Sequence, residues 1–134
     1  MGISLKFEAK EEFLYCRASG AYSFEDGCSV IREVLAESAQ RDATKVLVDC
    51  LQIEGRPSMV ERYEMAEFLA HELIAVISAG KSPPRLAVLA KEPLVDQNRF
   101  AELVATNRGV QTKTVEQMED ALKWLGVGSP DGRP

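Results

Sequence analysis

The sequence is poor in the residues that hold metal ions. It contains a single histidine, His71, and three cysteines, Cys16, Cys28 and Cys50, and no two cysteines form a C-x-x-C pair. This set argues against a zinc site, and we expect neither a metal nor a cofactor. The cysteines are typical of small buried side chains in a reducing compartment, which predicts a cytoplasmic protein.

A basic surface and a long apolar run are also missing. The 134 residues include 21 acidic and 16 basic side chains, for a formal net charge of −5. Proteins that bind nucleic acid or anionic membranes need a basic face, so we expect no nucleic-acid partner. The longest strongly apolar run, 73–77, is too short to span a bilayer. No apolar stretch follows the start of the chain, so we expect no signal peptide.

Motifs of common catalytic and nucleotide sites are absent as well. The sequence holds no P-loop, no G-x-G-x-x-G and no G-x-S-x-G. A Ser-His-Asp or Cys-His arrangement cannot be assembled with His71, which falls on the polar side of its predicted helix. We therefore assign no catalytic residue and interpret the chain as a non-enzymatic domain.

What the sequence does have is a regular succession of strand and helix patterns. Residues 3–8 alternate between apolar and polar side chains, and a second strand pattern at 13–20 follows a polar turn. Together they predict a hairpin. Short apolar runs typical of buried parallel strands then alternate with helical patterns. Further strands are predicted at 46–48, 86–90 and 110–113, and helices at 23–39, 58–79, 96–109 and 114–126.

This order predicts an α/β fold with an N-terminal antiparallel hairpin and four β-α units in a mixed, mostly parallel sheet. Right-handed crossovers between neighbouring strands would put the helices mainly on one face. We assign 1–126 to a single domain. The segment 127–134 is rich in glycine and proline and is predicted to be a flexible C-terminal tail.

Hydroxyl side chains mark several helix starts. Ser23 is predicted to cap the first helix. Ser58 and Glu61 have capping-box spacing at the start of the longest helix, and Thr114 and Gln117 repeat that spacing before the last one. In a capping box each of the two side chains accepts a hydrogen bond from a backbone N–H that the helix leaves unpaired.

Arg62 is the most unusual residue of the longest helix. Apolar residues cover nearly half of that helix, which predicts packing against two neighbours or against another subunit, and Arg62 lies inside this arc. An unpaired buried charge is costly, so Arg62 needs a partner or a path to solvent. We predict an ion pair with Asp49, a stem lying along apolar surface, or a clamp for an anionic group.

Several polar residues should gather where the strands end. Asp49 is predicted to end its strand, where it receives Arg62 or accepts from nearby backbone N–H groups. Arg56 and Ser58 follow in the next loop, and Arg99 could flank the same crevice. In α/β proteins this edge of the sheet is the usual binding site. Asp49, Arg56, Ser58, Arg62 and Arg99 are therefore the candidate binding residues.

The layout resembles the SpoIIAA-like (STAS/SEC14-type) bacterial domains, which are related to the STAS domains of anti-anti-sigma factors. The resemblance covers roughly 3–126. It is carried by VLVDCLQIEG at 46–55, the Arg62-Tyr63 pair, LAVLA at 86–90, RFAELVATNRGV at 99–110 and EDALKWL at 119–125.

The resemblance implies a regulatory domain that binds a partner protein. In anti-anti-sigma factors the equivalent loop ends in Asp-Ser-Ser-Gly, and a partner kinase phosphorylates one serine. Here the loop carries Ser58, which is the candidate phosphorylation site, but it lacks the preceding aspartate and the following glycine.

Three functions stay open. The first is a cytosolic interaction module that binds a protein at the edge formed by the loop 52–58 and the start of the long helix. The second is a domain for a small anionic or amphipathic ligand, which would use Arg56, Ser58 and Arg62. The third is an enzyme that uses Asp49 or Glu54. Homodimerisation through the apolar helix is a further prediction.

Overall fold

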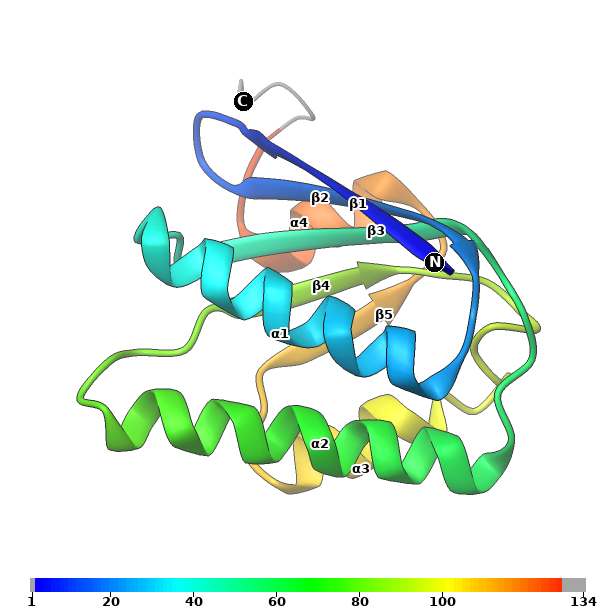
Figure 1. Ribbon diagram of the computed structural model, residues 1–134. Helices are drawn as coiled ribbons and strands as arrows, with labels where there is room; N and C mark the ends of the chain where they lie inside the picture. Colours follow the sequence, from blue (N-terminus) through cyan, green and yellow to red (C-terminus); the bar gives the residue numbers. More distant parts are fainter. Residues whose placement is uncertain (1, 129–134) are drawn as a thin grey trace.

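The computed structural model describes residues 2–128 and confirms the predicted α/β fold. A five-stranded sheet has the order β1-β2-β3-β4-β5, with β1 antiparallel to β2 and all other neighbours parallel (Figure 1). The elements are β1 (Ile3–Ala9), β2 (Leu14–Ala21), α1 (Phe24–Gln40), β3 (Lys45–Glu54), α2 (Met59–Ser78), β4 (Arg85–Leu89), α3 (Phe100–Asn107), β5 (Thr112–Val115) and α4 (Met118–Leu125).

Two of the three predicted serine and threonine caps are confirmed. The Ser23 side chain accepts a hydrogen bond from the backbone N–H of Asp26. Ser58 and Glu61 form both halves of a capping box at α2. The box predicted at Thr114 is wrong, because Thr114 belongs to β5 and its backbone N–H donates to a carboxylate of α3. Helix α4 begins after Gln117 without a side-chain cap.

The helices cover both faces of the sheet unequally. Helices α1, α2 and α3 lie on one face, as predicted for most helices, and α4 lies on the other (Figure 1). Alternation along β3 matches this division. Val46 and Val48 pack in the core that includes Val34 of α1, whereas Leu47 packs with Leu122 of α4. Each residue of β3 is thereby assigned to one face by its position alone.

Helix α2 stands away from the sheet. It packs against α1 and α3 rather than directly against the strands, which confirms that it has two neighbours. Its buried residues are Ala66, Ala70 and Leu73. The apolar arc predicted from the sequence is buried only along this central strip, and several of its large members are exposed.

The end of the described chain differs slightly from the prediction. Gly126 ends α4 in the left-handed conformation, and the backbone N–H of Val127 donates to the carbonyl of Leu122. Val127 is buried in the core beside α4, so it does not belong to a flexible tail. Residues 129–134 of the predicted tail lie outside the described residues.

Candidate functional site

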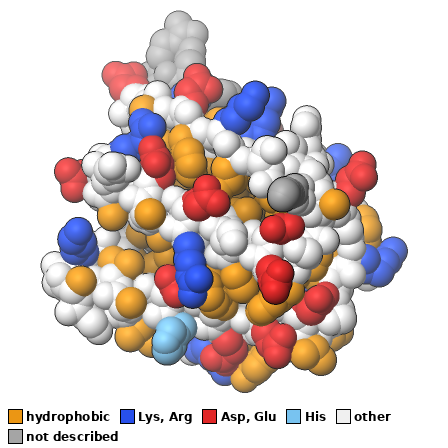
Figure 2. Space-filling model, viewed as in Figure 1, with side chains coloured by type: hydrophobic (Ala, Val, Ile, Leu, Met, Phe, Trp, Pro, Cys, Tyr) orange, Lys and Arg blue, Asp and Glu red, His pale blue; other side chains and the backbone are white. Residues whose placement is uncertain are grey.

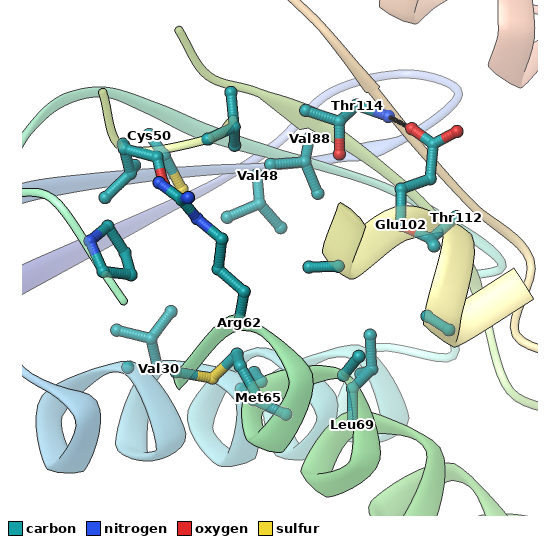
Figure 3. A pocket seen from close by; sticks show the side chains of 18 of the residues that line it. Val30, Val48, Cys50, Arg62, Met65, Leu69, Val88, Glu102, Thr112 and Thr114 are labelled. Carbon is teal, nitrogen blue, oxygen red and sulfur yellow. Dashed lines mark hydrogen bonds between the residues drawn. The ribbon is translucent and has the colours of Figure 1, made fainter. Parts of the chain in front are cut away.

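A cavity of about 240 Å³ lies between α2 and the inner face of the sheet. Its walls come from the sheet, α1, α2, α3 and the loop 91–99 (Figure 3). The walls are mostly apolar and include Val30, Val48, Met65, Leu69 and Val88. It is therefore suited to an apolar group rather than to a polar molecule.

The size of the cavity matters for stability. Empty space in a protein core costs about 24 cal/mol per Å³, so a dry cavity of this volume would cost about 6 kcal/mol. The stability of a whole domain is only about 5–15 kcal/mol. Apolar walls give water few hydrogen-bond partners, so water offsets little of this cost. An apolar occupant would recover much of it.

Arg62 spans this cavity. Its side chain leaves α2 and extends across the cavity toward the sheet near Cys50 (Figure 3). Its Nη2 donates to the carbonyl oxygen of Pro93 at 2.8 Å and to that of Leu94 at 3.4 Å. Its Nε lies 4.0 Å from Oδ1 of Asp96 and is buried without a hydrogen-bond partner. The side chain is 11% exposed, which confirms a buried arginine with partners.

The predicted ion pair between Arg62 and Asp49 is wrong. Asp49 lies in the interior of β3, which continues to Glu54, and not at the strand's end. It shares the face of Leu47, on the opposite side of the sheet from α2. Its Oδ2 accepts from the Tyr15 hydroxyl at 2.5 Å and its Oδ1 from the backbone N–H of Leu51 at 3.1 Å. The alternative, a role for Asp49 in accepting local N–H groups, is confirmed.

Burial and the hydrogen bond to Asp49 raise the pKa of Tyr15, so the phenol keeps its proton and donates. This contact links β2 to β3 on the α4 face. Asp49 is therefore separated by the sheet from Arg62 and from the cavity.

The remaining candidate residues are also placed apart from the cavity. Ser58 is exposed, and its hydroxyl is engaged in the capping box. Arg56 is exposed as well. Arg99 donates from Nη1 to the backbone carbonyl of Asp96 at 3.1 Å, and its Nη2 lies 3.6 Å from Glu116. Of the three residues predicted to hold a ligand, Arg62 alone lines the cavity.

The residue that the sequence reasoning missed is Asp96. Both of its carboxylate oxygens accept from the backbone N–H of Phe100, so it caps α3, and it faces Arg62. It was predicted as a helix cap but not as a neighbour of Arg62. A signal for the cavity was present in the alanines that face it, Ala66, Ala101 and Ala105, because small side chains leave space between a helix and a sheet.

A second feature lies on the outside of α2. Hydrophobic side chains are visible among charged ones on the face that carries α1 and α2 (Figure 2). At the start of α2, Met59, Val60 and Tyr63 are 51%, 65% and 42% exposed. We call these three residues the α2 start patch. Ile74 and Ile77, near the other end of the helix, are exposed to a similar extent.

The five-stranded sheet, its hairpin and its helices define an α/β domain of the SpoIIAA-like fold. Two solved structures share this architecture. One is an anti-sigma factor antagonist from Mycobacterium paratuberculosis, with a TM-score of 0.55 and 19% identity over 93% of this chain and 95% of that chain. The other is a protein with a SpoIIAA-like fold from Shewanella loihica, with a TM-score of 0.50 and 23% identity over 92% and 93%.

These similarities establish the fold that the resemblance implied. No family model and no curated protein matches the sequence. Within residues 2–128, no helix is both long and apolar enough to cross a membrane.

Proposed function

We propose that this domain is a regulatory module that binds a partner protein through the α2 start patch and the adjoining loop 52–58. The observation that carries the proposal is the exposure of three large apolar side chains, Met59, Val60 and Tyr63, within the first two turns of one helix. Neighbouring exposed apolar side chains rimmed by polar residues are typical of protein-interaction surfaces. Here the polar residues are Arg56 and Glu64, which are both exposed.

The fold supports the same proposal. An anti-sigma factor antagonist is named for its action in a regulatory circuit, and its architecture is shared along nearly the whole of this chain. Ser58 directly precedes the patch and is exposed. A phosphate on Ser58 would place about two negative charges next to the patch and next to Glu61, whose carboxylate lies 2.9 Å from the Ser58 backbone nitrogen. Phosphorylation of Ser58 would therefore oppose docking of an acidic partner.

A site-specific crosslinking experiment tests the proposal. A photoreactive amino acid at position 60 should capture a discrete partner in cells of the source organism, whereas the same amino acid at position 77 should not. Ile77 is the matched control, because it is an equally exposed apolar residue of the same helix. Val60→Glu should abolish capture from position 63, and Ile77→Glu should leave it unchanged.

Two results would contradict the proposal. Equal capture from both ends of α2 would show general stickiness of an apolar helix rather than a docking site. Capture of a second copy of this chain, together with a dimer by light scattering, would show that the patch is the predicted homodimer interface and not a site for a different protein.

A further inference from the structure

We infer that the cavity beneath α2 binds an aliphatic monocarboxylate, with the chain inside the cavity and the carboxylate on the guanidinium of Arg62. This inference is independent of the partner proposed for the outer side of α2. It follows from the polar groups of the lining and from the volume that the lining encloses.

The charged residues of the lining differ in whether their polar atoms are already paired. Glu61 accepts from the backbone N–H of Ser58 at 2.9 Å, and Glu102 accepts from that of Thr114 at 2.6 Å (Figure 3). Both carboxylates are therefore engaged as fixed parts of the fold. Arg62 keeps a buried Nε without a partner. The group available to a ligand is thus a cationic donor, and it selects an anionic acceptor.

The geometry of the donor favours a carboxylate. A guanidinium presents neighbouring N–H groups in one plane, and a carboxylate can accept two of them at once. Asp96 lies 4.0 Å from the Nε of Arg62, beyond hydrogen-bond distance, and its oxygens already accept from the backbone N–H of Phe100. A ligand carboxylate would supply the acceptor that Asp96 does not.

The volume sets the length of the chain. An apolar cavity of roughly 150 Å³ takes up benzene, with its six carbons. By proportion, 240 Å³ holds a chain of roughly eight to ten carbons. The side chains around it, such as Val48, Leu69 and Val88, offer only apolar contact along its length. Decanoate is therefore a suitable probe.

Calorimetric titration of the whole chain tests the inference, with decanoate below the concentration at which it forms micelles. Wild type should bind one decanoate, and decyl alcohol should bind more weakly. Arg62→Gln should weaken decanoate binding by about ten- to hundredfold and leave decyl alcohol unchanged, because the lost contact is to the charge. Arg99→Gln is the matched control, since Arg99 contacts the same loop without lining the cavity.

A cavity-filling variant gives a second, separate test. Val88→Phe should abolish binding of both compounds while circular dichroism shows a folded protein, because the ring takes the space of the chain. The inference is overturned if wild type shows no saturable binding, if Arg62→Gln binds decanoate as wild type does, or if Val88→Phe keeps its affinity. Binding to phosphatidylglycerol vesicles without binding of free decanoate would also overturn it, in favour of a membrane surface.

Discussion

The hydrogen bond between Tyr15 and Asp49 offers the best-defined energetic test of the structure. The hydroxyl of Tyr15 donates to Oδ2 of Asp49 at 2.5 Å, and Asp49 is only 7% exposed. Tyr15→Phe removes the hydroxyl but keeps the ring, which packs against the core that contains Leu47 and Leu122. The variant therefore isolates the loss of one donor to a buried carboxylate.

The expected loss can be estimated from the nature of the acceptor. A hydrogen bond to a charged group contributes about 1.5–3 kcal/mol, and its loss leaves a buried oxygen without that donor. At about 4 °C per kcal/mol for a domain of this size, Tm should fall by about 6–12 °C. Urea denaturation at pH 7, followed by circular dichroism, measures the free energy of unfolding directly.

Tyr63→Phe is the matched control. Tyr63 also accepts a side-chain hydrogen bond, from Arg108 at 3.2 Å, but it lies on the surface, so its loss should cost less than about 0.5 kcal/mol. In an Asp49→Ala background, Tyr15→Phe should lose most of its effect, because the acceptor is gone. Equal effects of the two tyrosine variants, or an unchanged effect of Tyr15→Phe in that background, would refute the reasoning.

Three other predictions follow from single groups. Ser58→Ala should lower the free energy of unfolding by about 1 kcal/mol, whereas Ser58→Asp should stay close to wild type because aspartate also caps helices; equal losses in urea denaturation would contradict the capping role. Burial raises the pKa of Cys16 and of Tyr22 to about 12, above the values near 9 and 10 of the unfolded chain. Their contribution to stability is therefore complete below pH 9 and lost as the pH rises toward 12, and a constant free energy of unfolding from pH 8 to 11 would be inconsistent with it. Burial also raises the pKa of Cys50 to about 12, so iodoacetamide at pH 8 should modify Cys50 roughly a hundred- to thousandfold more slowly than a free thiol, and fast modification would mean that Cys50 is accessible and ionised.

Periodicity in the sequence predicted the elements well but not which side of the sheet a polar residue faces. The strand at 46–48 was recognised from its apolar run, yet β3 continues to Glu54, past the polar residues that appeared to end it. Asp49 was therefore placed at an edge, next to Arg62. Alternation from Val48 puts Asp49 on the opposite face from α2. A longer strand would have predicted that separation from the sequence alone.

The position of Arg62 shows the opposite balance. Its place within an apolar arc correctly predicted a buried arginine that needs acceptors. The acceptors themselves, the carbonyls of Pro93 and Leu94, belong to the loop 91–99, and loops carry no periodic pattern from which a contact can be inferred. The cavity could not be predicted for a related reason, because it depends on how far α2 stands from the sheet, which tertiary packing determines.

The two proposals concern different faces of the same two turns of α2. Arg62 and Met65 line the cavity, whereas Val60 and Tyr63 are exposed. A ligand can change the affinity for a partner only if it binds different arrangements of α2 with different affinity. Arg62 also holds the loop at Pro93, so a carboxylate that takes over guanidinium donors alters a polar tie between that loop and α2. Linkage then requires the partner to change the ligand's affinity by the same factor, and titrations of decanoate with and without the crosslinked partner would measure that factor.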